Sequence, residues 1–285
     1  MDWYWEKIIW KLGILFIKEM KIIQYEINEL PFAVLDRYCS KFKDSKLANF
    51  CINSEQYSTE IKENKELHPW STWPSVHRGI EPEEHGIKML NQDIGYAEKY
   101  QTIWDDLIAR DKSIGVWGSL HSYFLPKNRH VKFYFPDPFS SRYKAFPNSL
   151  RDFQKLSESI SDFFTKTKTF RLINKALLNP LIFLVKGNLS LQDLRSIIKI
   201  LINYRAPLNQ TTFTFIQAEL SFNRFLIQLR ETKPDVAFFF SNHLAGAMHR
   251  YWHDFFSSDT KIFNKSSVLI AMKIFDSHIN KLVKL

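Results

Sequence analysis

Three short apolar runs constrain the fold more than any other feature of this sequence, because each changes to polar residues at its C-terminal end. The runs are KIIQYEIN (21–28), SIGVWGSL (113–120) and DVAFFFSN (235–242). Continuous apolar runs of this length are typical of strands buried in a parallel sheet. The carboxyl ends of parallel strands meet at one edge of the sheet, where ligands and catalytic groups gather. We therefore expect a functional site at the carboxyl edge of the first and third runs.

The segments between these runs have helical periodicity. Segments 30–43 and 92–110 carry apolar residues at near-helical spacing, and residues 148–230 are mostly helical in pattern. This order predicts a single α/β domain over residues 1–285. We expect a three-layer sandwich with a mostly parallel central sheet and helices on both faces, in which 148–230 is a helical insertion or cap.

The composition and charge limit which classes of binding partner and which cellular compartment we expect. The chain of 285 residues has a formal charge of +9 and a pI of about 9.3. Its lysines and arginines are spread along the chain, so nucleic acid is not a favoured partner. Neither of the glycine-rich phosphate-loop patterns GxxxxGKS/T and GxGxxG appears. Cys39 and Cys51 form no CxxC pair, which is typical of reduced thiols in a cytoplasmic protein.

The N-terminal segment is rich in tryptophan and lysine. Its apolar run from Ile8 to Ile17 is interrupted by Lys11 and is shorter than the roughly 18 apolar residues of a membrane span. The amphipathic pattern favours a helix that covers the sheet of its own domain. The alternative is a segment that rests on a membrane interface. No transmembrane segment is expected.

Glu26 and Asn28 lie on one face of the first predicted strand, because side chains alternate along a strand. At the edge of a sheet, two oxygen-bearing side chains can hold a divalent cation such as Zn²⁺ or Mn²⁺. The alternative, which this segment by itself favours, is that Asn28 caps the following helix and Glu26 pairs with a lysine.

The stretch HPWSTWPSVHRGIEPEEHGI (68–87) brings hydroxyl groups to the predicted start of a helix. Thr72 or Ser71 would be a nucleophile there, because backbone N–H groups and the helix dipole stabilise a phosphoryl anion at such a place. His77 and Arg78 would then bind substrate. The alternative is that the tryptophans and prolines wedge a corner and the hydroxyls only cap the helix.

A third cluster, SNHLAGAMHRYWHDF (241–255), follows the last predicted strand. Asn242 and His243 lie at the strand end, and His249 shares a helix face with the histidine four residues on. This i, i+4 pair of histidines is a geometry that can hold a metal, and we expect Arg250 to hold a phosphate with two hydrogen bonds. The cluster lacks the glutamate of an HExxH motif, so a zincin is not expected.

Taken in order, five segments resemble the alkaline phosphatase superfamily: EINELPFAVLDRY, PWSTWPSVHRGIEPEEHGI, VWGSLHSY, FPDPFS and FFFSNHLAGAMHRYW. They are most similar to its type I phosphodiesterase/nucleotide pyrophosphatase-like branch, which includes bacterial members found with surface-polysaccharide genes. The most specific element is GxxPxEHGI at 79–87. The resemblance covers residues 20–285 and implies an alkaline-phosphatase-like fold. It also implies a hydrolase in which a Thr or Ser attacks phosphorus with the help of divalent metals.

Carried over residue by residue, the resemblance places Asn28 and Asn242 where the family has aspartate metal ligands. Gly246 stands where the family has a histidine ligand, for which His243 and His249 would substitute as metal ligands. The family's nucleophile falls near Pro69, two or three places before the hydroxyls of this chain. The later Asp-His-Gly motif of the family has no counterpart before Leu285. We therefore expect one divalent metal site, and either a truncated chain or a branch that has lost the second site.

Three interpretations stay open on these residues. The first is a metal-dependent phosphoester or phosphodiester hydrolase, or a phosphoryl transferase, that acts on a phosphorylated small molecule or glycan in polysaccharide metabolism. The second is a degenerate, non-catalytic member that binds a phosphorylated glycan or a protein partner. The third is a folded but inactive remnant. A sheet that lacks its last strands would also leave an edge, so a homodimer is a further hypothesis.

Overall fold

The computed structural model describes residues 22–58, 67–90, 92, 95, 99–122, 128–137, 143–165, 190–206 and 209–285. Both alternatives for the N-terminal segment fall on residues 1–21, outside these ranges. The elements in chain order are β1 (Ile22–Ile27), α1 (Phe32–Lys41), α2 (Lys46–Ile52), α3 (Pro69–Arg78), α4 (Pro82–His85), α5 (Ile103–Ala109), β2 (Ile114–Trp117), β3 (Val131–Phe135), η2 (Asn148–Leu150), α6 (Arg151–Thr165), α8 (Leu191–Ile198), η3 (Lys199–Asn203), α9 (Gln210–Thr232), β4 (Val236–Ser241), α10 (His243–Phe256), α11 (Thr260–Lys265) and α12 (Ser267–Leu282). Within the described ranges, every helix is too short or too polar to span a membrane.

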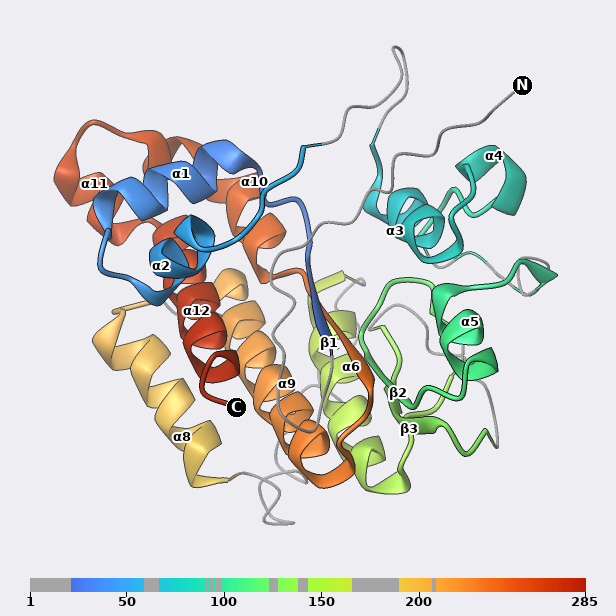
Figure 1. The fold of residues 1–285 in the computed structure, drawn as a ribbon. Coiled ribbons are helices and arrows are strands. Elements are labelled where there is room, and N and C mark those ends of the chain that lie inside the picture. The colour runs from blue at the N-terminus through green and yellow to red at the C-terminus, as the bar shows by residue number, and fades with distance from the viewer. Residues whose placement is uncertain are drawn as a thin grey trace.

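The described strands form one parallel sheet in the order β1-β4-β2-β3 (Figure 1). The three strands predicted from the apolar runs are confirmed as β1, β2 and β4. β4 lies between β1 and β2 and is buried at every position, which explains its uninterrupted apolar run. β3 is absent from the predicted strands because Lys132 interrupts its apolar pattern. The expectation of an α/β fold with a parallel central sheet is therefore confirmed.

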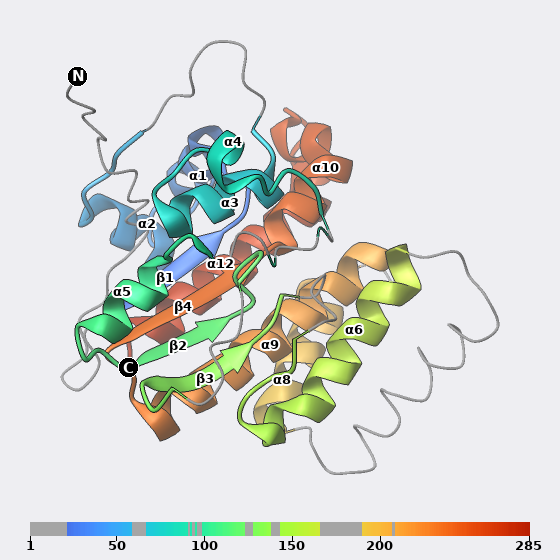
Figure 2. The same cartoon turned by 90° about the vertical axis from the view of Figure 1, so that its right-hand side faces the viewer.

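Side chains alternate between the two faces of the sheet, and each face has its own aromatic core. On the first face, the rings of Tyr25 and Phe239 lie 6.1 and 5.2 Å from Phe222 of α9. On the second face, Phe238 meets Trp104 of α5 edge to face at 5.9 Å. The helices α9 and α12 thus cover the first face, and α3 and α5 cover the second (Figures 1 and 2).

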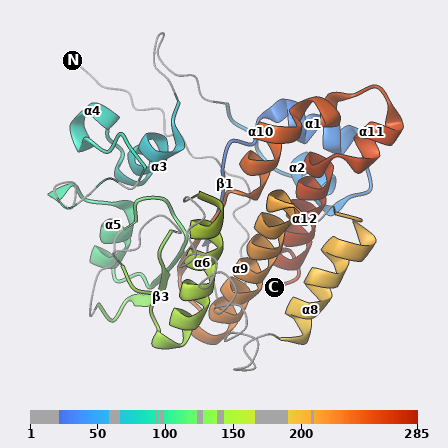
Figure 3. The same ribbon diagram turned by 180° about the vertical axis from the view of Figure 1, so that it is seen from behind.

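The long helix α9, which belongs to the segment 148–230, packs directly on the sheet. Its Phe215, Phe222, Phe225 and Leu226 side chains are almost completely buried in the core of the first face. Figure 3 shows α9 between α6 and α12, with α8 packed along it. This part of the segment therefore supplies one layer of the sandwich.

The helix α5 is shorter than its predicted segment, whereas α1 fills most of segment 30–43. α5 begins at Ile103 because Thr102 and Asp105 form a capping box. The Thr102 backbone N–H donates to Asp105 Oδ2 at 2.8 Å, and the Asp105 N–H donates back to Thr102 Oγ1. Such reciprocal bonds satisfy the free N–H groups at a helix start and so determine where the helix begins.

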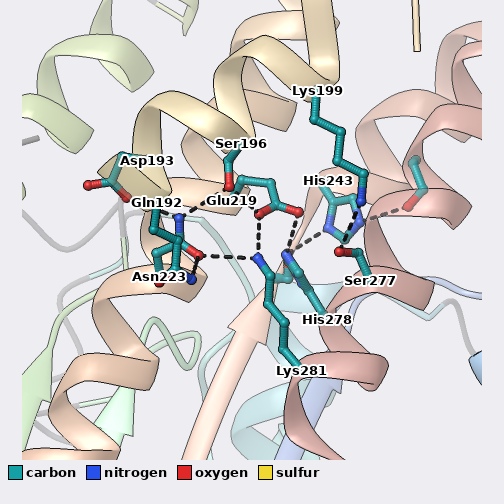
Figure 4. A network of polar contacts seen from close by, with 12 residues as sticks. Gln192, Asp193, Ser196, Lys199, Glu219, Asn223, His243, Ser277, His278 and Lys281 are labelled. Carbon is teal, nitrogen blue, oxygen red and sulfur yellow. Dashed lines mark hydrogen bonds and ion pairs between the residues drawn. The ribbon is translucent and has the colours of Figure 1, made fainter. Parts of the chain in front are cut away.

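A buried polar network joins α8, α9 and α12 on the first face (Figure 4). Glu219 Oε2 accepts from Lys281 Nζ at 2.9 Å and from Ser196 Oγ at 3.1 Å, and Glu219 Oε1 is 3.4 Å from His278 Nε2. His278 Nδ1 lies 2.8 Å from Tyr25 Oη, so the network reaches β1. Burial raises the pKa of Glu219, but His278 and Lys281 outweigh it and hold that pKa well below its usual range.

Candidate functional site at the carboxyl edge of the sheet

The residues that directly follow β1 and β4 are in contact. These strands pair with Ile27 opposite Ser241, so Asn28 and Asn242 come next to each other. Asn28 Nδ2 donates to Asn242 Oδ1 at 2.8 Å and to Glu29 Oε1 at 3.2 Å. The parallel pairing thus brings two segments together that are more than two hundred residues apart in the chain.

The helix α10 brings a histidine to the same place. It starts directly after β4, and His249 in its second turn reaches back to the end of β1. His249 Nε2 lies 2.5 Å from Glu29 Oε2, with the two side chains 63% and 33% exposed. Glu29 has a φ of 56°, a left-handed conformation that is uncommon for a residue other than glycine. The Glu29–His249 pair therefore lies at the solvent-exposed rim of the sheet edge.

The helix α3 contacts this group from the second face of the sheet. The Trp73 indole Nε1 donates to Asn28 Oδ1 at 3.0 Å, so both polar atoms of the Asn28 side chain are engaged. Figure 2 shows α3 and α10 beyond the ends of β1 and β4. We call this group the strand-edge network, and it consists of Asn28, Glu29, Trp73, Asn242 and His249.

Ser71 and Thr72 lie in the first turn of α3, immediately before Trp73. The helix begins at Pro69, with His68 as its N-cap residue. Ser71 is buried and its Oγ donates to His68 O at 3.0 Å, so this hydroxyl is used within the helix turn. Thr72 is half-buried and adjoins the tryptophan of the strand-edge network. Of the two residues, Thr72 is therefore the more exposed.

Glu26 is not part of the strand-edge network, although it shares a strand face with Asn28. Its Oε1 lies 2.8 Å from His77 Nε2, and both side chains are buried. Gln24 Nε2 donates to the same oxygen at 3.1 Å. Glu26 thus pairs with a histidine of α3, where the sequence alternative named a lysine, and the pair anchors α3 to β1.

The PEEHGI part of the stretch holds α4 against α3. His85 is fully buried, its Nε2 lies 2.9 Å from Ser75 Oγ, and its Nδ1 accepts from the Ile87 N–H at 3.0 Å. Burial, together with the nearby Arg78 guanidinium, lowers the pKa of His85 to about 4. Arg78 is itself buried in this cluster. This segment therefore positions α3 relative to α4.

Two of the predicted residues have their hydrogen bonds outside the strand-edge network. His243 is buried, with its Nδ1 2.7 Å from Ser241 Oγ and its Nε2 donating to Ala271 O of α12 at 3.2 Å. Burial lowers the pKa of His243 to about 3. Arg250 is exposed, and its Nη1 donates to Gly246 O of its own helix at 2.7 Å. Of the predicted metal ligands, the structure thus brings together Asn28, Asn242 and His249, and it places Glu26 and His243 elsewhere.

Glu29 and Trp73 were not among the residues predicted from the sequence. The position of Glu29, a carboxylate directly after Glu26 and Asn28, could have indicated it as a site residue. The Glu29 side chain reaches His249, however, only because the φ of Glu29 is positive. Trp73 carries no comparable signal, since an indole usually serves as a packing group.

The strand-edge network has a mixed donor set. In the described part of the chain, no group of three or more His, Cys, Asp or Glu side chains could hold a metal ion. The network combines one such carboxylate and one imidazole, Glu29 and His249, with the amide oxygens of Asn28 and Asn242. Hard divalent cations accept carboxylate and amide oxygens, and Zn²⁺ and Mn²⁺ also accept imidazole. These are donor types that a divalent cation accepts, and in this structure each of them is paired with another member of the strand-edge network.

Comparisons of the chain with protein-family models, with curated proteins and with solved structures found no match.

Proposed function

We propose that the protein is a metal-dependent phosphoester or phosphodiester hydrolase, or a phosphoryl transferase, with its site at the strand-edge network. The observation that carries this proposal is the meeting of Asn28, Glu29, Asn242 and His249, which α3 contacts through Trp73. The resemblance to the alkaline phosphatase superfamily supports the same site, because it places metal ligands at Asn28 and Asn242. Phosphorylated small molecules or glycans are the substrates that this resemblance suggests.

In this proposal the residues of the strand-edge network have different roles, which follow from the chemistry of their side chains. Glu29 and His249 would hold one divalent cation, with Asn28 and Asn242 as neutral oxygen ligands. Such a cation supplies Lewis-acid polarisation of a phosphoryl oxygen. Thr72 would attack phosphorus through its hydroxyl oxygen and displace the alcohol of the ester, and water would then release the phosphate from Thr72. Asn28 Oδ1 already accepts a hydrogen bond from Trp73, which fixes the orientation of the amide.

Calorimetry with Zn²⁺ and with Mn²⁺ tests the metal site. We expect one saturable site in the wild type and its loss in Glu29→Gln, because that change removes the only carboxylate of the network. The matched control is Glu231→Gln, which removes an exposed carboxylate at the end of α9 and should leave binding unchanged. Absence of saturable binding in the wild type would exclude the metal-dependent mechanism.

Turnover of a chromogenic phosphodiester tests the nucleophile. We expect Thr72→Ala to abolish turnover while metal binding persists, and Ser71→Ala to have a smaller effect because the Ser71 hydroxyl is bonded to His68 O. Equal turnover in the wild type and in both variants would reject the first turn of α3 as the source of the attacking oxygen.

A second candidate is a member of the same superfamily that binds a phosphorylated glycan or a protein partner without turnover. The observation that favours it is the pair of amides at Asn28 and Asn242, which hydrogen-bond to each other at 2.8 Å. Hard cations prefer anionic oxygens, so amides at both positions weaken the site. This candidate predicts saturable binding of a phosphorylated glycan with no turnover. It also predicts that Asn28→Asp together with Asn242→Asp tightens metal binding.

A further inference from the structure

Exposed apolar side chains gather on the helical segment formed by α8 and the following η3. Large apolar residues are exposed there at four positions, with exposed fractions of 73%, 43%, 52% and 67%: Leu191, Leu194, Ile198 and Ile202. Spacings of three and four residues place these side chains on one side of a helix. Among the described residues, no other helix exposes more than one such side chain. We call this group the α8 stripe.

The opposite side of the segment holds it to the protein. Gln192 Nε2 donates to Asn223 Oδ1 of α9 at 2.8 Å, and Ser196 Oγ donates to Glu219 Oε2 at 3.1 Å. Ile200 is almost completely buried in the core of the first face. Figures 1 and 3 show α8 at the margin of the molecule, with α9 and α12 on one side of it. The stripe therefore faces away from the body of the protein, and a cluster of exposed apolar side chains of this kind marks an interaction site.

The exposed charges of this segment are all positive. The one acidic residue of 190–206 is Asp193, which is fully buried, and its Oδ2 pairs with Arg224 Nη2 at 2.8 Å. Arg195, which adjoins the stripe, and Arg205, shortly after η3, are exposed. The sequence that leads into α8 is also basic, because residues 166–189 contain five lysines and arginines and neither aspartate nor glutamate. The apolar surface of the α8 stripe is therefore combined with positive charge.

We propose that the α8 stripe is a docking surface for an anionic membrane, on which α8 and η3 lie along the lipid headgroups. A helix with an apolar side and basic flanks binds such a surface in two ways. Its aliphatic side chains enter the boundary between headgroups and acyl chains, and its cations are attracted to anionic headgroups. Because the stripe is short, neither contribution holds the protein alone, and the binding is reversible and sensitive to salt.

The composition of the stripe favours lipid over protein as the occupant. All four side chains are leucine or isoleucine, whereas the residues that dominate protein–protein binding are enriched in tryptophan, tyrosine and arginine, and leucine is under-represented among them. A second copy of the chain is disfavoured by charge, because a symmetric contact brings the same surface of both copies together. It would place the cations around Arg195 against each other in a chain of net charge +9, and like charges across an interface oppose association.

Sedimentation of the full-length protein with lipid vesicles tests the proposal and needs neither metal nor turnover. We expect the protein to bind vesicles of phosphatidylcholine with about one-third phosphatidylglycerol at least about tenfold more tightly than vesicles of pure phosphatidylcholine. In about 1 M salt, where the Debye length is about 3 Å, we expect this preference to disappear. Absence of binding to the anionic vesicles, or equal binding to both kinds at low salt, would overturn the proposal.

A stripe variant and a matched control locate the surface. We expect Leu194→Gln with Ile198→Gln to weaken binding to anionic vesicles at least about tenfold, because polar side chains do not enter the acyl boundary. The control is Ile103→Gln with Ile262→Gln, which changes two isoleucines of similar exposure, 39% and 45%, on α5 and α11. The control should bind as the wild type does. Equal binding of the stripe variant and the control would overturn the proposal and place any vesicle contact on another segment.

The variant Arg195→Gln tests the contribution of charge. We expect about fivefold weaker binding to the anionic vesicles, because one cation near the headgroups is lost. An unchanged affinity would overturn the choice of an anionic surface.

Light scattering of the wild type and of the stripe variant, without lipid, tests the second copy as the occupant. We expect a monomer in both. A dimer that the stripe variant loses, in a protein that does not bind vesicles, would show that a second copy covers the stripe and would overturn the proposal. Circular dichroism of each variant confirms that it is folded before the comparison is made.

Discussion

Acidification from pH 7 to pH 5 tests the burial of His243, the first residue of α10. Its neutral ring donates from Nε2 to Ala271 O and faces Ser241 Oγ with Nδ1. Burial, with the nearby His278, lowers the pKa of His243 to about 3 in the folded protein, whereas the unfolded chain has a histidine pKa of about 6.5. Below pH 6.5 the unfolded state therefore binds a proton that the folded state does not. Stability is full above this pH and falls as the pH drops toward the folded-state value.

The size of the effect follows from the two pKa values. At pH 5 the pH lies about 1.5 units below the pKa of a histidine in the unfolded chain. Relative to pH 7, the free energy of unfolding is therefore lower by about 2 kcal/mol. Urea unfolding at pH 7 and at pH 5 measures it for the wild type and for His243→Gln, which keeps a side-chain N–H for Ala271 O. We expect the variant to be less stable at pH 7, but to lose about 2 kcal/mol less than the wild type on acidification.

Buried histidines other than His278 contribute to the acid loss equally in both proteins and cancel in this comparison. The His278 ring lies 5.9 Å from the His243 ring and its titration is coupled to that of His243. The matched control is His253→Gln, which replaces an exposed histidine of the same helix and leaves the His243 imidazole in place. It should show the acid loss of the wild type. An equal acid loss in the wild type and in His243→Gln would refute the reasoning that this imidazole is buried in its neutral form.

Two further predictions concern the core and use urea unfolding at pH 7. Gly115→Ala would place a Cβ 2.2 Å from the Phe133 ring, so we expect a loss of about 1–3 kcal/mol from overpacking. Gly246→Ala in α10 meets no atom closer than 3.8 Å, so we expect a gain of up to about 1 kcal/mol; equal effects of the two changes would contradict the strand contact. Glu219→Gln removes the buried carboxylate that pairs with Lys281, and we expect a loss of about 3–5 kcal/mol. A loss below about 1 kcal/mol would show that the pair is not buried as described.

The sequence by itself determined the elements whose patterns are local. Apolar runs of strand length identified β1, β2 and β4, because a strand covered on both faces must be apolar at nearly every position. The same runs end where Asn28 and Asn242 begin, and parallel strands bring their carboxyl ends together. The contact between these two asparagines was therefore foreseeable from two distant segments. The strand β3 was not foreseeable, because Lys132 interrupts the apolar pattern of its five residues.

Only the tertiary structure decided which side chains surround that contact. His243 and His249 are six residues apart on α10, which places them on different sides of the helix; the first is buried against α12, and the second meets Glu29. Periodicity reports which residues are buried, but a contact between distant side chains depends on strand register, helix rotation and single backbone torsions, and the positive φ of Glu29 is one of them.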